Sequence, residues 1–256
     1  MHWIIQDNLH DERGYDVLLE TVKRFKLQHT FVKVVPFTHE LQPSVEPDGL
    51  SIVMGSITLG KIAVNSGWIP GCFTNENFHY TAWREHLGQH LLNHDAVVCR
   101  FGDVAPPPHE FFIRPCRDDK SFTGIVMQPD EFLEWRQRVL DLQNHYTTLD
   151  ASTEVCYGAA RKIYQEFRLF VVDGEVVTGS QYKLGRAVVL NAEVPPHVLE
   201  FANRMIQKWT PDRAFCLDVA DTPVGLKVLE IGCLNSCGFY ASDVQLLVLR
   251  LNEMQF

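Results

Sequence analysis

The 256-residue sequence lacks several features that would place it among membrane, secreted or nucleic-acid-binding proteins. It has no long hydrophobic run, and its opening residues, MHWIIQDNLHDERGYD, reach charged side chains after a short apolar stretch. Neither a membrane span nor a secretory signal is therefore predicted. No dense run of Lys and Arg occurs and the net charge is -9, so general nucleic-acid binding is not expected. We expect a soluble, cytoplasmic protein that does not bind membranes.

Two common ligand-binding signatures are also missing. The seven cysteines are odd in number and scattered, with Cys233 and Cys237 four positions apart and no Cys-x-x-Cys pair. This pattern favours reduced, buried thiols over a disulfide framework or a zinc site. The glycine-containing stretch GSITLG at residues 55–60 lacks the Lys and Ser/Thr of a Walker loop. We interpret it as a turn into a helix.

The composition that remains is that of a folded protein, with 46% hydrophobic and 21% charged residues. Residues 1–75 alternate short apolar strands with a helical pattern at residues 15–27, which is typical of a small α/β unit. The run Ala-Pro-Pro-Pro at residues 105–108 marks a break. We therefore predict an N-terminal α/β lobe at residues 1–105 and a second lobe at residues 106–256.

The second lobe is predicted to be rich in hairpins. Strands are expected at residues 110–114, 155–157, 165–172, 175–182, 214–219 and 226–231, and helices at residues 129–144, 196–209 and 243–253. The pair Asp173-Gly174 is the strongest hairpin signal in the chain. The fold class is therefore α+β, with an antiparallel sheet in the second lobe.

A first group of candidate site residues follows the strand predicted at residues 110–114. Arg114, Arg117 and Lys120 lie close together in sequence, and Gly124 follows them. A glycine-containing loop with fixed cations can close over phosphates and neutralise their charge. A solvated loop whose cations pair with the neighbouring aspartates explains this segment equally well.

A second group lies on the strand predicted at residues 165–172. Period-two alternation places Glu166 and Arg168 on one face, and Tyr182 or Lys183 on the return strand would face Arg168. An acid and a cation side by side suit a ribose hydroxyl and a phosphate. A simple cross-strand salt bridge is the alternative interpretation.

A third group places an acid on each of two neighbouring strands. Asp218 and Glu230 are flanked by apolar residues, and Asn235 lies in the loop that follows. Oxygen ligands on adjacent strands suit magnesium that is shared with phosphates. Burying two carboxylates among apolar side chains is costly unless a cation compensates them.

Together the three groups resemble the ATP-grasp superfamily, in the reduced form found in predicted amide-bond ligases of phages and bacteria. The resemblance covers roughly residues 80–250. The family's Lys-Pro resembles Arg114-Pro115, its Glu-x-Arg strand resembles Glu166 and Arg168, its later cation resembles Lys183, and its metal-binding Asp and Glu-x-Asn resemble Asp218, Glu230 and Asn235. Two positions differ from the family pattern. Gly232 stands where the Asn usually follows the Glu, and Cys216 stands where many members carry an Arg.

The resemblance implies an ATP-grasp fold, with a small N-terminal α/β lobe and an antiparallel nucleotide-binding lobe, and it implies ATP and Mg²⁺ as cofactors. The implied magnesium ligands are Asp218, Glu230 and Asn235. The implied nucleotide contacts are Arg114, Lys120, Glu154, Val155, Cys156 and Glu166, where residues 154–156 hold adenine through backbone groups and Glu166 binds the ribose. The implied catalytic cations are Arg168, Lys183 and Arg186.

The activity implied by the resemblance is ligation of a carboxylate to an amine through an acyl phosphate, with a small molecule or a peptide as substrate. A homodimer is compatible with this interpretation. Two other hypotheses are an ATP-binding regulatory module without chemistry and an ATP-dependent phosphotransferase on the same fold. The sequence does not identify either substrate.

Overall fold

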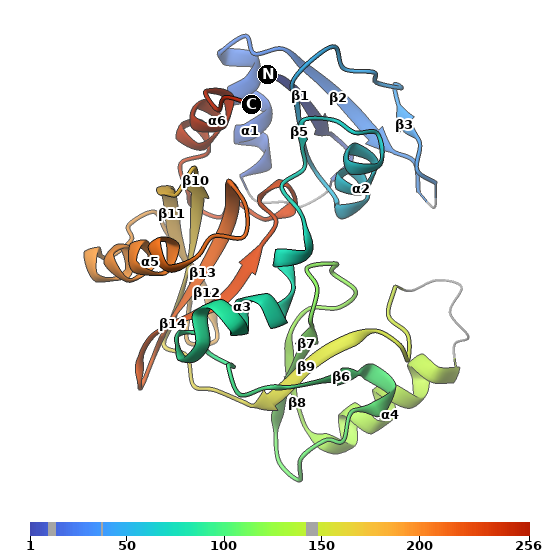
Figure 1. Cartoon of the computed structure of the whole chain (residues 1–256), viewed down its shortest axis with the longest axis vertical. Helices are drawn as coiled ribbons and strands as arrows, with labels where there is room; N and C mark the ends of the chain where they lie inside the picture. The colour runs from blue at the N-terminus through green and yellow to red at the C-terminus, as the bar shows by residue number, and fades with distance from the viewer. Residues whose placement is uncertain (10–13, 37, 142–147) are drawn as a thin grey trace.

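The computed structural model describes residues 1–9, 14–36, 38–141 and 148–256. Its strands form three sheets that follow one another along the long axis of the molecule, and both termini lie at the same end (Figure 1). No helix in these described ranges is long and apolar enough to span a bilayer.

The N-terminal sheet has the strand order β3-β2-β1-β4-β5. Its strands are β1 (His2–Gln6), β2 (His29–Val34), β3 (Leu41–Gln42), β4 (Ser51–Met54) and β5 (Pro70–Gly71), and all neighbours pair in parallel except β2 with β3. Helices α1 (Tyr15–Arg24) and α6 (Val244–Asn252) pack with Trp3 and Ile5, whereas α2 (Ile57–Asn65) packs with Ile4. β1 is buried on both faces, which explains its continuous apolar run. The turn into a helix predicted at residues 55–60 is confirmed, because Ser56 caps α2.

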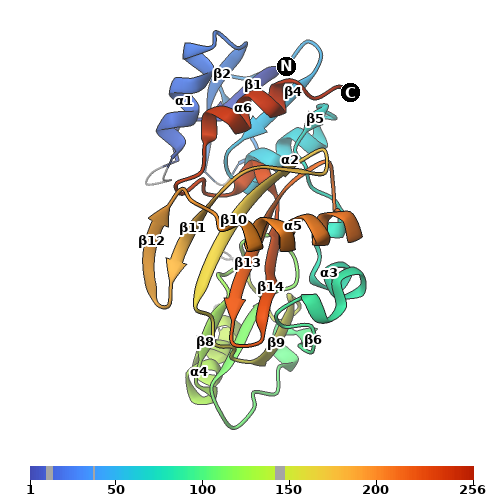
Figure 2. The same cartoon turned by 90° about the vertical axis from the view of Figure 1, so that its left-hand side faces the viewer.

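The middle sheet is antiparallel and has the order β12-β11-β10-β13-β14. Its strands are β10 (Gln165–Val172), β11 (Glu175–Leu184), β12 (Ala187–Asn191), β13 (Ala214–Thr222) and β14 (Gly225–Gly232). The predicted hairpin is confirmed, since Asp173 and Gly174 join β10 to β11 with φ angles of 48° and 81°. Helix α5 (Pro196–Lys208) lies across one face of this sheet (Figure 2), and α3 (Tyr80–Leu87) packs into the same core.

The two faces of β10 have different surroundings. Phe167, Leu169 and Val171 point into the core that α5 and α3 cover. On the opposite face, Phe170 and Val172 pack with α1 and α6 of the N-terminal sheet. Glu166 and Arg168 precede Phe170 on this same face, and they face the third sheet instead.

The third sheet has the order β6-β9-β7-β8, formed by β6 (Val97–Arg100), β7 (Phe111–Pro115), β8 (Ile125–Met127) and β9 (Glu154–Ala159). Helix α4 (Pro129–Asp141) packs on it through Phe132 and Val139, and the last residues of the helix predicted at 129–144 lie outside the described ranges. The boundary predicted between residues 105 and 106 falls inside this sheet, because β6 precedes it and pairs with β9 beyond it.

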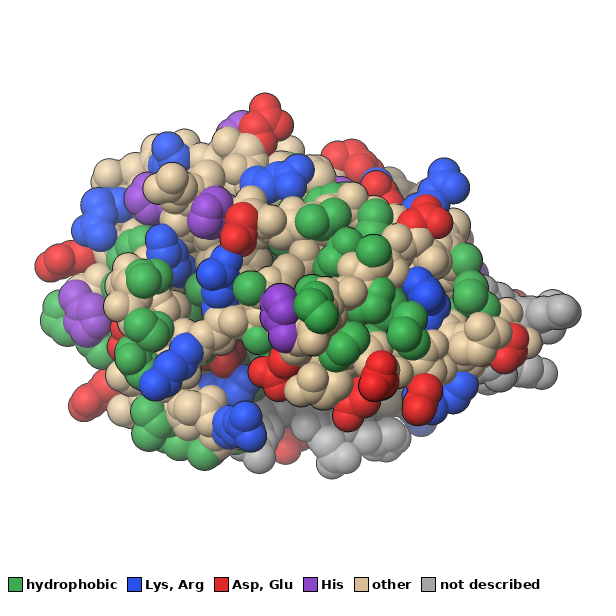
Figure 3. Space-filling model, turned by 90° about the horizontal axis from the view of Figure 1, so that it is seen from below, with side chains coloured by type: hydrophobic (Ala, Val, Ile, Leu, Met, Phe, Trp, Pro, Cys, Tyr) green, Lys and Arg blue, Asp and Glu red, His purple; other side chains and the backbone are tan. Residues whose placement is uncertain are grey.

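Four short 3₁₀ turns complete the described chain: η1 (Glu76–Phe78), η2 (Gly88–His90), η3 (Phe101–Asp103) and η4 (Leu234–Ser236). On the face seen from below in Figure 3, hydrophobic side chains gather beside scattered acidic and basic ones.

Candidate active site

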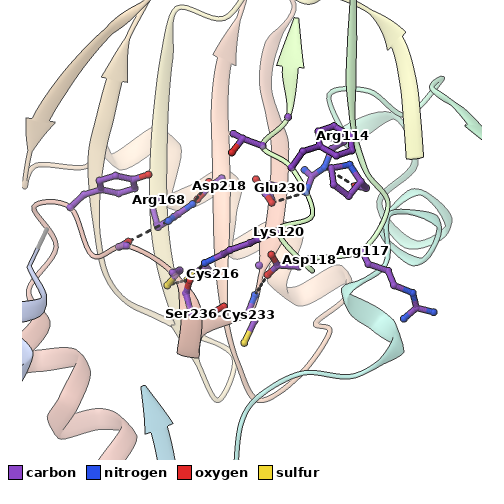
Figure 4. A pocket seen from close by; sticks show the side chains of 18 residues that line it. Arg114, Arg117, Asp118, Lys120, Arg168, Cys216, Asp218, Glu230, Cys233 and Ser236 are labelled. Atoms are coloured by element: carbon purple, nitrogen blue, oxygen red, sulfur yellow. Dashed lines mark hydrogen bonds and ion pairs between the residues drawn. The ribbon is translucent and has the colours of Figure 1, made fainter. Parts of the chain in front are cut away.

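A cleft separates the middle sheet from the β6-β9-β7-β8 sheet (Figure 4). It contains two cavities of about 480 and 580 Å³. Both are lined by Arg114, Thr123, Gly124, Arg168, Asp218, Glu230 and Tyr240, so the two cavities lie side by side in the cleft. The cleft is large enough for a nucleotide together with a second small ligand.

Arg168 and Asp218 form a buried ion pair at the centre of this cleft. They stand opposite each other on β10 and β13, and Arg168 donates from Nε and Nη2 to the two Asp218 carboxylate oxygens at 2.9 and 2.8 Å. The side chains are only 15% and 3% exposed. Burial lowers the pKa of Arg168, but the adjacent Asp218 carboxylate outweighs this and holds that pKa well above its ordinary value. Arg168 is therefore a permanent cation.

A second ion pair spans the cleft between the two sheets. Arg114 is the penultimate residue of β7, and its Nη2 lies 2.6 Å from Oε1 of Glu230 on β14. The guanidinium also lies 4.9 Å from the centre of the Trp83 ring, a cation–π contact. Arg114 is buried, whereas the Glu230 side chain is one-third exposed to the cavity. Glu230 is thus the more accessible of the two central carboxylates.

Asp218 and Glu230 are directly opposed on β13 and β14, which confirms that the two acids come from adjacent strands. No cluster of three or more His, Cys, Asp or Glu residues that would cage a metal occurs among the described residues. Mg²⁺ does not need such a cage, because it is held by one or two carboxylates together with phosphate oxygens and water. The pair therefore fits a magnesium ion delivered with a nucleotide, provided that the two arginines share or release their carboxylates.

Asn235 does not line the cavities that contain Asp218 and Glu230. Its buried amide instead connects the loop after β14 to the N-terminal sheet. Oδ1 accepts a hydrogen bond from the Phe73 N–H at 2.8 Å, and Nδ2 donates to the Val53 carbonyl at 2.7 Å. The structure thus separates Asn235, which the sequence predicts as a magnesium ligand, from Asp218 and Glu230. Both ends of its amide already have backbone partners.

The loop of residues 116–124, between β7 and β8, brings part of the predicted cation cluster to the cleft. Lys120 lines the cavity and donates to the Ser236 carbonyl. Arg117 also reaches the cavity wall, but its guanidinium pairs with Glu76 at 2.9 Å in an exposed position. Lys120 is therefore the loop cation best placed to meet phosphate.

Asp118 from the same loop occupies the space above Gly232. Its carboxylate accepts a hydrogen bond from the Cys233 N–H at 2.7 Å, and burial raises its pKa. A Cβ atom at position 232 would lie 3.3 Å from the Asp118 Oδ2 atom. A larger side chain at 232 would therefore have to displace Asp118, which gives a physical reason for glycine at this position.

Lys183 pairs with Glu166, whereas Arg168 pairs with Ser180, and a register shift lies between Glu166 and Phe167. Lys183 Nζ lies 2.9 Å from Glu166 Oε1, and the Tyr182 hydroxyl donates to Glu166 Oε2 at 2.7 Å. The sequence predicts that Tyr182 or Lys183 faces Arg168, and of these two residues Lys183 does not. Tyr182 does reach Arg168, with its ring centre 5.7 Å from the guanidinium carbon.

Residues 154–156 do not face the nucleotide-sized cavity. β9 is an interior strand whose backbone pairs with β6 on one side and β7 on the other, and Val155 and Cys156 are completely buried. The Glu154 carbonyl accepts from the Cys116 N–H. Their backbone groups are therefore already used within the sheet and are not available to hold adenine. Arg186 lies in the exposed turn between β11 and β12 and does not line either cavity.

Two aromatic residues that contact the arginines of the cleft were not predicted from the sequence. Tyr240 lies 5.0 Å from the Arg168 guanidinium carbon and stacks on Tyr182 with a centre-to-centre distance of 4.7 Å. Trp83 supports Arg114 in the same way. Neither belongs to a motif, since each meets its arginine from a distant part of the chain. The Asp118 contact was missed because its sequence neighbours suggested a solvated loop.

The fold resembles solved ligases and a solved synthetase over nearly its whole length. The D-alanine–D-alanine ligase from Bacillus anthracis has a TM-score of 0.63 and 12% identity, with 98% of this chain and 96% of that chain covered. The D-cycloserine synthetase DcsG has a TM-score of 0.64 and 12% identity, covering 98% and 99%. The ATP-grasp ligase PsnB, complexed with a minimal precursor, has a TM-score of 0.55 and 10% identity, covering 98% and 97%. Identities this low establish the fold alone.

No curated protein sequence matches the chain. The chain does match a family model, which is described as an ATP-grasp domain of clade family 3, over residues 20–251. The match includes the residues that form both ion pairs and the loop with Lys120, and the antiparallel sheet agrees with the fold of the solved ligases. The chain therefore belongs to this ATP-grasp family.

Proposed function

We propose that the protein is an ATP- and magnesium-dependent ligase that joins a carboxylate to an amine through an acyl phosphate. The observation that carries this proposal is the presence of two arginine–carboxylate pairs in one cleft, Arg168–Asp218 and Arg114–Glu230. A buried ion pair contributes little net stability relative to apolar side chains of similar volume, so the presence of these pairs is better explained by chemistry. The solved enzymes of similar fold include proteins named as ligases and a synthetase, which supports the same class of reaction.

The phosphate end of ATP would lie between the two sheets. In the proposal, Asp218 and Glu230 hold magnesium together with phosphate oxygens, while Arg114 and Lys120 bind the phosphates directly. When bound, magnesium neutralises charge on the phosphates and favours transfer of the terminal phosphoryl group. The one-third exposure of Glu230 supports its access to a metal that arrives with the nucleotide.

The adenine ring would occupy the apolar part of the 580 Å³ cavity. Phe112, Val126, Ile163 and Leu229 line that part, and they come from both sides of the cleft. Glu166, held by Lys183 and Tyr182, lies in the same cavity and is the proposed ribose contact. This assignment replaces residues 154–156, whose backbone groups are used within their sheet.

Arg168 is the proposed stabiliser of negative charge during acyl transfer. A substrate carboxylate oxygen would attack the terminal phosphorus, ADP would leave, and the amine would then attack the acyl carbon and release phosphate and a proton. Negative charge develops first on the transferring group and then on the tetrahedral carbonyl oxygen, and a fixed buried cation stabilises both. Lys183 lies farther along the cleft beside Glu166 and would add positive charge there.

A screen for phosphate release tests the proposal. Pools of small carboxylates and peptides would be combined with pools of amines, in the presence of ATP and magnesium. The ligase proposal predicts ADP and phosphate only when a carboxylate and an amine are both present, together with a product whose mass equals their sum minus water. A Glu230→Gln protein provides the matched inactive control.

Two alternatives predict different outcomes in the same screen. A stable phosphorylated product, formed with a single acceptor, would identify an ATP-dependent phosphotransferase. Nucleotide binding without turnover in any combination would favour a regulatory module. The regulatory-module alternative is suggested by Cys216, which occupies the position of an Arg in many members of the family.

A further inference from the structure

Cysteines meet in pairs around the segment that follows β14. The Cys216 and Cys237 sulfur atoms lie 2.8 Å apart, and those of Cys72 and Cys233 lie 3.6 Å apart. All four are free thiols. The members of each pair come from different elements, since Cys216 lies in β13 and Cys237 follows η4. Long-range folding, rather than a sequence motif, creates these contacts.

The same segment connects several functional parts of the cleft. Its backbone binds three side chains of the candidate site: the Cys233 N–H donates to Asp118, the Ser236 carbonyl accepts from Lys120, and the Gly238 carbonyl accepts from Arg168. A covalent change at Cys237 therefore acts directly beside the carbonyl that contacts Arg168.

We propose that Cys216 and Cys237 form an oxidisable dithiol at the wall of the cleft, which a hydroperoxide converts to a disulfide. Cys237 lines both the 480 Å³ cavity and a neighbouring cavity of about 300 Å³, so a small oxidant can reach it. Cys216 lines the larger of these cavities and is almost fully buried behind it. A disulfide has a sulfur–sulfur distance of about 2.05 Å, so the two atoms need to approach by less than about 1 Å.

The chemistry requires one equivalent of hydroperoxide. The Cys237 sulfur attacks a peroxide oxygen, the O–O bond breaks, and Cys237 becomes a sulfenic acid with release of water or an alcohol. The Cys216 sulfur then attacks the Cys237 sulfur, loses its proton, and displaces the sulfenic oxygen as water. Both thiols are oxidised by two electrons in total, and the peroxide is reduced by the same two electrons.

The consequence for activity rests on the proposed ligase function. Magnesium binding requires Arg168 to share or release Asp218, and Arg168 also donates to the Gly238 carbonyl at 3.3 Å. The disulfide would join Cys237 to Cys216, which lies on β13 two positions before Asp218. It would therefore hold the Gly238 carbonyl against the strand that carries Asp218. The disulfide thus retains the Arg168–Asp218 pair and opposes magnesium-dependent turnover.

Peptide mapping of the full-length folded protein tests the disulfide itself. The protein would be treated with hydrogen peroxide, its remaining thiols alkylated, and the peptides analysed by mass spectrometry with and without dithiothreitol. We expect a dithiothreitol-sensitive peptide that links Cys216 to Cys237, formed at lower peroxide concentration than any other link. A Cys99→Ser protein should form it normally, and a Cys237→Ser protein should not form it. Alkylated Cys216 and Cys237, or a link from Cys72 to Cys233 alone, would overturn the proposal.

Turnover measured on the same samples tests the regulatory consequence. Oxidation should lower ATP-dependent turnover at least about tenfold in the wild type, dithiothreitol should restore it, and the Cys237→Ser protein should resist peroxide. Unchanged turnover in a sample with the mapped disulfide would overturn the regulatory role. A reduced wild type without turnover on any substrate would instead count against the ligase proposal, while the disulfide would still be decided by the peptide masses.

Discussion

The N-terminal sheet and the middle sheet both contain five strands, yet they bury different kinds of side chain. Among the described residues, the buried polar side chains of the strands of the N-terminal sheet are the uncharged Gln6 and Ser51. The middle sheet buries Glu166 and Asp218, and Arg168 is nearly buried beside them. Burying a charge costs several kcal/mol before its partners compensate it. The middle sheet therefore carries an energetic cost that the N-terminal sheet avoids, which points to a functional use of its charges.

The architecture explains why the charges lie where they do. The N-terminal sheet is largely parallel and has helices on both faces, which leaves only its edges open. In the middle sheet α5 and α3 cover one face, while the other face is covered in part by α1 and α6 and in part lines the open cleft. A half-covered antiparallel sheet therefore supplies rigid positions for charged groups that a ligand can reach.

The largest effect is expected for Glu230→Gln, which removes charge from the middle sheet while nearly preserving shape. Turnover should fall by at least about 10³-fold, because the variant loses a proposed magnesium ligand. The fold should persist, since Arg114 keeps its contacts with Trp83 and the Pro115 carbonyl. Steady-state rates and circular dichroism on the same preparation check both parts. A wild-type rate would make Glu230 a structural residue and remove the functional contrast between the sheets.

Arg168→Ala should reduce turnover by about 10²- to 10³-fold, the usual cost of losing one anion-stabilising donor. The sequence alone suggests an exposed pair and little loss of stability, but the pair is buried, so the variant should also lose about 3–5 kcal/mol as Asp218 is left uncompensated. Adding Asp218→Asn should recover part of the stability without recovering turnover. Denaturant unfolding of both variants measures this recovery. A stability loss of similar size in the single and double variants would contradict the buried-pair account.

Asn235→Ala tests the connection between the two regions. The change leaves the Phe73 N–H and the Val53 carbonyl without their side-chain partner and should lower the free energy of unfolding by about 1–3 kcal/mol. Magnesium-dependent nucleotide binding should persist. Calorimetric titration with ATP and magnesium decides between this role and the metal role predicted from the sequence, because loss of binding with normal stability would restore Asn235 as a ligand.

The smallest effect is expected for Arg186→Ala. This residue lies in an exposed turn at the far end of the β11–β12 hairpin, and surface substitutions of this kind change stability by less than about 0.5 kcal/mol. Turnover should remain within about twofold of the wild type. A large loss of turnover would show that the turn reaches the substrate during the reaction and would restore the catalytic role predicted from the sequence.

Local signals were sufficient to predict much of the middle sheet. Asp173-Gly174 predicts the hairpin. Period-two alternation predicts that Phe167 and Leu169 point to one face of β10 and Arg168 to the other. The register shift after Glu166 was not predictable, because it depends on how two strands pair rather than on either strand alone. This shift places Lys183 opposite Glu166.

Contacts between distant segments limit how much of the candidate site can be predicted from the sequence. Asp218 and Glu230 were identifiable because apolar neighbours made their burial costly. The interior position of β9 depends on β6, which lies more than 50 residues earlier, so the sequence did not show that the backbone at residues 154–156 was already paired. The partners of Asn235 come from β4 and from the residues after β5, and its role was missed for the same reason.

The central claim is that the charges of the middle sheet hold ATP together with magnesium. Thermal unfolding of the wild type and of Glu230→Gln, with ATP plus magnesium or ATP plus a chelator, tests it without knowledge of the substrates. At a nucleotide concentration about 100 times Kd, magnesium-ATP should stabilise the wild type by about 2.7 kcal/mol and raise its Tm by about 5–10 °C. The chelator, or Glu230→Gln, should remove most of that rise. Equal rises in Tm with and without magnesium, or an undiminished rise in Glu230→Gln, would contradict the account.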